Sequence, residues 1–228
     1  MKTELIVALD MEYNEANEMV KLLKDTVKYY KIGPVFFMKY GIKAIEMVNK
    51  YEGKVFLDLK LHDIPNTVKQ AIDNANSLDI YSISVHLLGG PLMLKAAINS
   101  SKKIKIWGVT ILTSLDLIEF NKIGFRYSLQ KQVHHLAKMA MESGIDGVIS
   151  SPQELYYLRN TLSKELKIIT PSIRLSEKYE NDDQKRFLTP KEAKDLGASF
   201  IVVGRPIIQA KDPLKSAQSI LEQIKWMS

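Results

Sequence analysis

The chain has 228 residues, of which 46% are hydrophobic and 25% are charged, a composition that excludes a disordered or fibrous protein and suits one large domain. It contains no cysteine, which excludes disulfides and thiolate metal sites and agrees with a cytoplasmic location; we also expect no signal peptide and no membrane span, because no apolar run approaches the ~18 residues that a span needs. The formal net charge of +6 suits either nucleic acid or a small anionic substrate, and although the lysines are scattered, the charge alone does not choose between the two.

Short apolar segments alternate with longer amphipathic segments along the whole chain. The expected strands are Leu5–Leu9, Tyr29–Ile32, Val55–Lys60, Ile80–His86, Ile104–Val109, Gly147–Ser150, Lys167–Pro171 and Phe200–Val203. The expected helices lie near Asn14–Lys28, Lys39–Lys50, Asn66–Ser77, Pro91–Asn99, Leu129–Ser143, Pro152–Leu162, Pro190–Leu196 and Leu214–Met227. Several strands are almost continuously apolar, which is typical of parallel strands covered on both faces. This alternation predicts a single-domain (β/α)8 TIM barrel, a catalytic domain over residues 1–228; an open doubly wound sheet is the alternative, because the sequence does not show closure.

The most informative segment lies at the end of the third expected strand. It reads Asp-Leu-Lys-Leu-His-Asp-Ile-Pro-Asn-Thr over residues 58–67. If the strand continues through Lys60, Asp58 and Lys60 point to the same face, where charged groups are costly unless they pair or take part in chemistry. Asp63 adds a second carboxylate within reach of the same ammonium, and carboxylates favour its protonated form. This arrangement suits a proton donor in a site where negative charge develops.

The ends of the other expected strands carry further polar residues. In barrels of this kind the catalytic groups gather at the C-terminal ends of the strands. The residues at or just after these ends are Asp10, Lys31, Asp58, Lys60, Thr113, Ser114, Arg174, Gly204 and Arg205. Any one of them alone is explained by a surface salt bridge. Chance would place charges equally at the strand starts, however, so the whole set predicts one site at this mouth of the barrel.

Residues 202–206, Val-Val-Gly-Arg-Pro, have the composition of a phosphate site. Gly204 lets the backbone approach a ligand, and Arg205 offers a planar fork of donors. Barrels often bind phosphate after the last two strands. The irregular stretch 174–188 is long and polar, which we interpret either as a lid or as an exposed insertion. Gln184 in this stretch is a candidate to fold over the phosphate.

Residues 58–67, with their Ile-Pro-Asn-Thr tail, resemble the signature of the orotidine 5′-phosphate decarboxylase family. The resemblance extends over nearly the whole chain, and its further matches follow the order of the family. They are Ala8-Leu9-Asp10, Lys31-Ile32-Gly33, Val85-His86 with Gly89-Gly90, Leu112-Thr113-Ser114, Ile173-Arg174, Asp183-Gln184-Lys185-Arg186, Leu188-Thr189-Pro190 and Val203-Gly204-Arg205-Pro206-Ile207. The chain departs from the family at Ser172, where bacterial members usually carry glycine, and in the loop of residues 176–182.

The resemblance implies decarboxylation of orotidine 5′-phosphate to uridine 5′-phosphate, with no metal and no organic cofactor. Lys60 would donate a proton to the C6 carbanion, Asp58 would lie near the substrate carboxylate, and Lys31 would complete a network of alternating charges. The implied catalytic residues are Lys60, Asp58, Asp63 and Lys31. The implied substrate-binding residues are Asp10, Lys31, Asp58, Leu59, Lys60, Leu61, His62, Asp63, Ile64, Pro65, Asn66, Thr67, Thr113, Arg174, Gln184, Gly204 and Arg205.

The same resemblance implies further contacts and a partner chain. Asp10 would hold the ribose hydroxyls, and either Thr113 or Ser114 would meet the pyrimidine edge. The partner would be a second copy of the chain, because in this family the residues matched by Asp63 and Thr67 reach the site of the neighbouring subunit. We therefore expect a homodimer, with no nucleic-acid or membrane partner.

Two other functions fit parts of this pattern. Related barrels use the same Asp-x-Lys-x-x-Asp spacing with a magnesium ion, for the decarboxylation of keto-gulonate phosphate or for hexulose-phosphate aldol chemistry. The Ile-Pro-Asn-Thr tail, Lys31 and residues 183–186 favour the metal-free enzyme over these. A nucleotide-binding or RNA-binding barrel without catalysis would need a disrupted set of acids and lysines, whereas here the set is intact.

Overall fold

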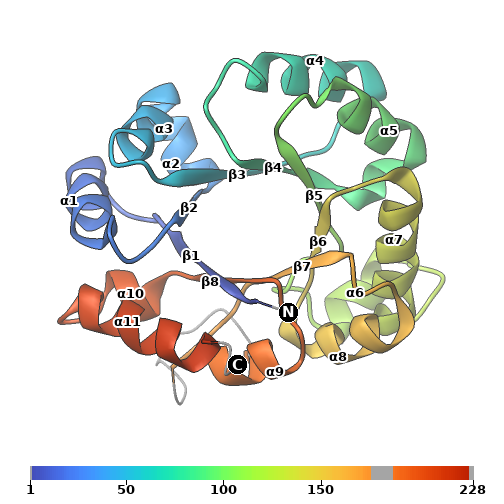
Figure 1. Cartoon of the computed structure of the whole chain (residues 1–228). Coiled ribbons are helices and arrows are strands. Elements are labelled where there is room, and N and C mark those ends of the chain that lie inside the picture. Colours follow the sequence, from blue (N-terminus) through green and yellow to red (C-terminus); the bar gives the residue numbers. More distant parts are fainter. Residues whose placement is uncertain (1, 176–186, 226–228) are drawn as a thin grey trace.

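Eight parallel strands form a closed barrel in the computed structural model, which describes residues 2–175 and 187–225 (Figure 1). The strands are β1 (Glu4–Ala8), β2 (Tyr29–Ile32), β3 (Lys54–Leu61), β4 (Ser82–His86), β5 (Lys105–Val109), β6 (Gly147–Ile149), β7 (Lys167–Thr170) and β8 (Phe200–Val203). Each strand pairs with the next one, and β8 closes the barrel against β1, where Val7 lies opposite Val203. The predicted (β/α)8 barrel is therefore confirmed, and the open sheet is excluded.

Helices follow the strands and surround the barrel as an outer layer (Figure 1). They are α1 (Tyr13–Leu23), α2 (Pro34–Tyr40), α3 (Ile42–Asn49), α4 (Pro65–Ala75), α5 (Gly90–Ser100), α6 (Leu117–Ile123), α7 (Leu129–Ser143), α8 (Pro152–Thr161), α9 (Pro190–Asp195), α10 (Arg205–Ile208) and α11 (Pro213–Ile224), with a 3-10 helix, η1, at Leu87–Gly89. Their apolar faces are buried, as at Val20 of α1, Ile72 of α4 and Ile220 of α11. Over the described ranges, no helix has both the length and the apolar character needed to cross a membrane.

The helices differ from the predicted ones in three respects. The first predicted helix is shorter and ends at Leu23. The helix predicted over 39–50 is replaced by two helices, α2 and α3, because Gly41 between them has a φ of 57°, which glycine adopts without strain and which interrupts a helix. The short helices α6 and α10 were not predicted. The start of α6 does carry a local signal, since Asp116 and Glu119 form a capping box.

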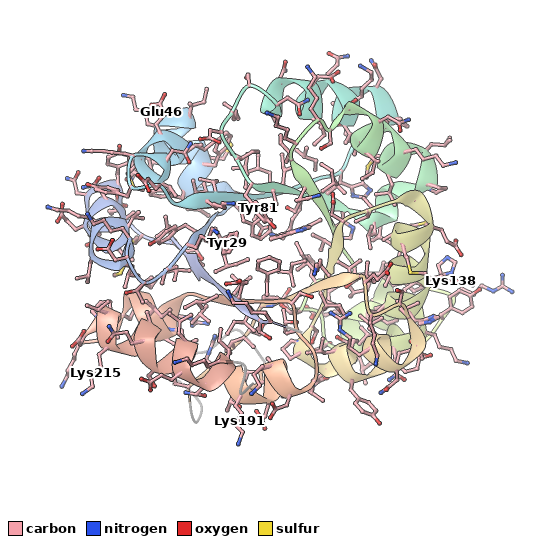
Figure 2. All side chains as sticks on the ribbon, in the orientation of Figure 1. Tyr29, Glu46, Tyr81, Lys138, Lys191 and Lys215 are labelled. Atoms are coloured by element: carbon pink, nitrogen blue, oxygen red, sulfur yellow. The ribbon has the colours of Figure 1, made fainter. Side chains whose placement is uncertain are left out.

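Inside the barrel, strand alternation sorts the inward-facing side chains into layers. Tyr29, Phe56, Tyr81, Trp107 and Phe200 form an aromatic layer, in which the ring centroids of Phe56 and Trp107 lie 4.6 Å apart and those of Trp107 and Phe200 lie 5.1 Å apart. Figure 2 places Tyr29 and Tyr81 near the centre of the ring of strands. The aromatic layer fills the barrel interior, so that the next inward-facing residues along β2 and β3 open towards the C-terminal mouth.

Candidate active site

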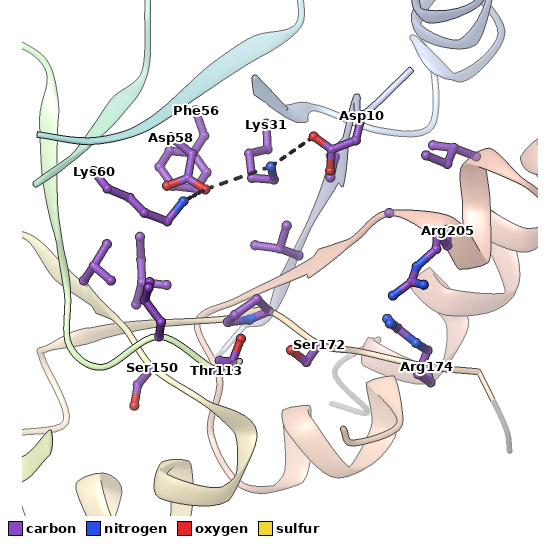
Figure 3. Close-up of a pocket in the computed structure, with 18 of the residues that line it drawn as sticks. Asp10, Lys31, Phe56, Asp58, Lys60, Thr113, Ser150, Ser172, Arg174 and Arg205 are labelled. Carbon is purple, nitrogen blue, oxygen red and sulfur yellow. Dashed lines mark hydrogen bonds and ion pairs between the residues drawn. The ribbon is translucent and has the colours of Figure 1, made fainter. Parts of the chain in front are cut away.

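A cavity of about 550 Å³ opens at the C-terminal mouth of the barrel. The predicted residues that line it are Asp10, Lys31, Asp58, Lys60, Thr113, Arg174, Gly204 and Arg205. Figure 3 shows acidic and lysine side chains from the ends of β1, β2 and β3 on one side of this cavity and two arginines on the other. The structure therefore brings together most of the polar residues that were predicted to meet at this mouth.

Four charged side chains alternate in sign across the cavity, and we call them the charged row: Asp10, Lys31, Asp58 and Lys60 (Figure 3). Lys31 Nζ lies 3.5 Å from Asp10 Oδ1 and 3.9 Å from Asp58 Oδ2. Lys60 Nζ lies 2.8 Å from the same Asp58 Oδ2. The side chains of Asp58 and Lys31 are 11% and 14% exposed, so water and salt screen this inner pair less than a surface pair. Each charge is thus held by neighbours of opposite sign.

Strand alternation accounts for the inner pair of the charged row. Lys31 lies two residues after Tyr29 on β2, and Asp58 lies two residues after Phe56 on β3, so both project inward just beyond the aromatic layer. Gly33 leaves room for the lysine, because a Cβ at this position would lie 3.0 Å from Lys31 Nζ. A larger residue at this position would require the Lys31 ammonium and the Asp10 carboxylate to shift by a few tenths of an ångström.

Lys60 reaches Asp58 through an irregular strand end. Its φ is 51°, a left-handed conformation that residues other than glycine rarely adopt, and the pairing of β3 with β4 shifts register between Leu57 and Leu61. Regular alternation, from which the closeness of the two side chains was predicted, therefore does not hold at Lys60. Ser84 of β4 instead links the two residues: it accepts a hydrogen bond from the backbone N–H of Lys60 and donates one to Asp58 Oδ1, each 2.8 Å long.

The remainder of the segment 58–67 does not line the cavity. Leu59 and Leu61 are partly buried and pack against the core. The exposed residues are His62, Asp63, Ile64, Pro65, Asn66 and Thr67. Asp63 accepts a hydrogen bond on Oδ1 from the backbone N–H of Ile64, at 2.7 Å, and within the described chain no ion pair joins it to Lys60. Substrate contacts from this exposed part of the segment stay predictions.

His62 and His86 stack at the edge of the mouth, near Lys60. Their ring centroids lie 5.3 Å apart, with 21° between the ring planes. Burial, together with the nearby His62 and Lys60, lowers the pKa of His86 to about 4. The Nδ1 atom of His86 accepts a hydrogen bond from the backbone N–H of Leu88, at 3.3 Å. At neutral pH His86 is therefore an uncharged acceptor that holds the start of η1.

Two arginines lie on the side of the cavity away from Lys60 (Figure 3). Arg174 follows β7 and is only 5% exposed. Arg205 is the first residue of α10 and directly follows Gly204 at the end of β8. Two guanidinium groups that line one cavity suit an anion with several oxygen atoms, such as a phosphate. Gln184, the third predicted phosphate contact, lies outside the described residues.

Ser172 also lines the cavity, and its φ is 63°. This is the left-handed region, which glycine enters at no steric cost, so the glycine that the family resemblance led us to expect here would fit the backbone without strain. In the part of the chain that the structure describes, three non-glycine residues have a positive φ: Glu52, Lys60 and Ser172. Two of these three line the cavity, in keeping with the tendency of strained backbone to cluster at functional sites.

The lining of the cavity decides between Thr113 and Ser114, and it includes residues that the sequence analysis did not predict. Thr113 lines the cavity, whereas Ser114 is exposed and does not line it, which favours Thr113 for a contact with a ligand. The lining residues that were not predicted include Ile111, Leu112, Ser150, Pro171, Ile208 and Gln209. Most of them are apolar, and nothing in the local pattern separates them from core residues. Ser150 follows β6 directly, so the strand-end rule could have found it.

The described carboxylates and histidines are not arranged as a metal centre. Across residues 2–175 and 187–225, no three His, Asp or Glu side chains are grouped so that they could hold one. Both oxygens of Asp58 already have partners, Ser84 on Oδ1 and the two lysines of the charged row on Oδ2. The positive charges that face the cavity are ammonium and guanidinium groups, which suit the stabilisation of an anion that binds or forms there.

Comparisons with known proteins agree with this arrangement. Residues 3–220 match the family model described as Orotidine 5′-phosphate decarboxylase / HUMPS family. The orotidine 5′-phosphate decarboxylase of Carboxydothermus hydrogenoformans is 43% identical, over 99% of this chain and 97% of its own length. That of Wolbachia pipientis subsp. Culex pipiens is 41% identical, over 96% of this chain and 98% of its own length. The crystal structure of orotidine 5′-phosphate decarboxylase from Lactobacillus acidophilus is 36% identical, has a TM-score of 0.85, and covers 98% of this chain and 99% of that chain.

Proposed function

The chain belongs to the orotidine 5′-phosphate decarboxylase / HUMPS family, and from this membership we propose that it removes carbon dioxide from orotidine 5′-phosphate to give uridine 5′-phosphate. This reaction is the last step of pyrimidine nucleotide synthesis. The single observation that carries the proposal is the charged row, which sets a lysine ammonium against a buried carboxylate at 2.8 Å inside the mouth of the barrel. The proposed place of the reaction is the cytoplasm, and the cysteine-free composition agrees with it.

The chemistry requires fixed positive charge. Loss of the carboxylate leaves an electron pair on C6 of the pyrimidine ring, where no carbonyl or imine is placed to delocalise it. We assign the stabilisation of this carbanion, and the proton transfer that follows, to the Lys60 ammonium. Its pairing with Asp58 holds the positive charge in position before the substrate arrives, so that little reorganisation is needed during the reaction.

Asp58 would lie near the substrate carboxylate. Two carboxylates in contact repel each other, and the repulsion is relieved as carbon dioxide departs. Lys31, at 3.9 Å, balances the charge of Asp58 from the side away from Lys60. Asp10, the next member of the charged row, is 56% exposed on its side chain and would accept hydrogen bonds from the ribose hydroxyls.

The two arginines would bind the substrate phosphate at the other end of the cavity. Arg205 and the backbone after Gly204 lie where barrels of this kind often hold phosphate, and Arg174 adds a second fork of donors. Gln184 is proposed to add a further hydrogen bond to the phosphate, and Thr113 is proposed to contact the pyrimidine edge. Binding energy from this remote end helps to drive the reacting end against Lys60.

The proposed reaction needs no metal ion, in contrast to the magnesium-dependent reactions that use the same motif spacing. In those reactions a carboxylate of the motif helps to hold the metal. In this chain Ser84 and Lys60 each lie 2.8 Å from an oxygen of Asp58, which leaves this carboxylate poorly available as a ligand.

Turnover of orotidine 5′-phosphate in excess chelator tests both the substrate and the metal-free chemistry. We expect the decrease in ultraviolet absorbance to proceed at the same rate with and without chelator, because the charge that stabilises the carbanion belongs to Lys60. Loss of activity on chelation, with recovery on addition of Mg²⁺, would contradict the metal-free mechanism. No turnover under either condition would contradict the proposed substrate.

We further propose a homodimer in which Asp63 and Thr67 reach the site of the neighbouring subunit. The exposure of both side chains supports this assembly. Large apolar side chains are exposed just before α4 and on η1 and the adjacent α5: Ile64 is 66% exposed, Leu88 40% and Leu92 73%. Exposed apolar surface of this kind is typical of a protein interface.

Mixing two inactive variants tests the shared site. Lys60→Ala and Asp63→Ala homodimers should each be nearly inactive. If Asp63 serves the partner, a hybrid dimer has one site that holds both native residues, so a random 1:1 mixture refolded or co-expressed should regain about one quarter of wild-type activity. If Asp63 serves its own chain, every site of the hybrid lacks one of the two residues and the mixture stays inactive, which would contradict the shared site.

A further inference from the structure

Ser84 of β4 lies between the two residues that carry the proposed chemistry, and the proposed mechanism gives it no task. Its side chain is fully buried, at 0% exposure. The backbone N–H of Lys60 donates a hydrogen bond to Ser84 Oγ at 2.8 Å, and Ser84 Oγ donates one to Asp58 Oδ1 at 2.8 Å. One hydroxyl thus connects the backbone of Lys60 to the carboxylate that holds the Lys60 ammonium.

The backbone N–H of Lys60 needs a hydrogen-bond acceptor outside the strand ladder. Its φ of 51° takes β3 out of regular pairing with β4, where the register shifts between Leu57 and Leu61. A backbone N–H that leaves the strand ladder in a buried place must find another acceptor, because an unpaired buried donor is costly. Ser84 supplies this acceptor. The Ser84 hydroxyl also donates its own hydrogen to Asp58 Oδ1, so both its acceptor and its donor functions are satisfied.

We propose that Ser84 is a positioning residue, which holds Lys60 in its left-handed conformation and orients Asp58 so that Oδ2 faces the ammonium groups of Lys31 and Lys60. The proposal rests on the proposed function of Lys60 as proton donor. Without the hydroxyl, both charged groups remain but lose their mutual placement. Misplacement of a reacting group by about 1 Å can lower a rate about 100-fold. Binding of the substrate phosphate depends on the opposite end of the cavity and is preserved.

The same strand provides a matched control. Ser82 lies two residues before Ser84, on the same inward face of β4, and is also 0% exposed. Its Oγ is buried without any hydrogen-bond partner in the described part of the chain. Ser82→Ala therefore removes the same atom from the same strand without breaking a hydrogen bond, whereas Ser84→Ala breaks two.

Steady-state kinetics of the two variants test the proposal. We expect Ser84→Ala to lower kcat about 10- to 100-fold while KM stays within about threefold of wild type, because placement is lost and binding is not. Ser82→Ala should keep the wild-type kcat and KM. Equal kcat values for the two variants would overturn the role of Ser84.

Two further measurements keep the test decisive. If Ser84→Ala does not fold, Ser84→Cys, which has a similar volume and a weakly hydrogen-bonding thiol, should show the same fall in kcat. A crystal structure of the folded variant should show Lys60 out of the left-handed region, or Lys60 Nζ further from Asp58 Oδ2 than the present 2.8 Å; unchanged geometry would overturn the proposal. If the wild-type protein fails to decarboxylate orotidine 5′-phosphate, the proposed function falls, and this structural comparison still decides whether Ser84 positions Lys60.

Discussion

Lys60→Ala is expected to lower kcat for orotidine 5′-phosphate by at least about 10⁴-fold, because general acid catalysis and electrostatic stabilisation each contribute at least about 10²-fold. Both contributions come from one ammonium, so they are lost together. Phosphate binding is assigned to Arg174 and Arg205 in the proposed mechanism, so the Kd of uridine 5′-phosphate should change by less than about tenfold. Ultraviolet assays measure the first quantity, and calorimetric titration measures the second.

A second lysine offers the control for this variant. Lys69 pairs with Asp73 at 2.7 Å on the exposed surface of α4. Lys69→Ala also removes an ammonium and an ion pair, but Lys69 does not line the cavity, so kcat and the Kd of the product should stay unchanged. Near-normal turnover in Lys60→Ala would remove Lys60 from the role of proton donor. A large loss of product binding would instead indicate that Lys60 mainly binds the ligand.

Asp58→Asn is expected to lower kcat on the order of 10³-fold. The amide has nearly the same shape and its oxygen still accepts a hydrogen bond from Ser84, so the loss reports the missing charge. Unit charges about 4 Å apart interact by about 4 kcal/mol at an effective dielectric constant near 20, which corresponds to a factor on the order of 10³. Without this charge, the ammonium groups of Lys31 and Lys60 repel each other and Lys60 is no longer held against the substrate. Initial rates under saturating substrate measure the effect.

The matching control is Asp73→Asn, which breaks the exposed pair with Lys69. Exposed pairs contribute little, about 0–1 kcal/mol, so this change should leave both kcat and stability near wild type. A wild-type kcat in Asp58→Asn would show that the reaction does not depend on a fixed position of the Lys60 ammonium. In that case the charged row would be a structural feature and the proposed mechanism would need another source of stabilisation.

Sequence periodicity predicted the strands well and the helices less well. All eight strands lie within one or two residues of their predicted bounds, because each apolar segment is buried on both faces and contrasts with its polar flanks. The helix predicted over 39–50 was wrong at its start, since the break at Gly41 depends on a backbone conformation that the apolar pattern does not report. Helix α10 was missed because four residues are too short for a periodic signal.

The sequence predicted which charged residues form the candidate site, but not the hydrogen bonds that link them. The strand-end rule identified both lysines and both aspartates of the charged row, since it needs only the ends of the strands. The same rule could not find Ser84, which lies within β4 and acts through contacts with β3. Asp63 was predicted to lie within reach of the Lys60 ammonium, but in this chain it is exposed and bound to its own backbone neighbour.

The sequence by itself determined which segments become strands, which charged groups stand at their ends, and, through the segment 58–67, the family to which the chain belongs. Only the tertiary structure decided that the sheet closes, that Lys31 and Lys60 face the same oxygen of Asp58, and that Lys60 takes a left-handed conformation in which its backbone N–H donates to Ser84. The physical reason is that periodicity and motifs report local geometry, over a few residues. The distances between side chains on different strands depend on register and closure, which are set by packing of the whole barrel.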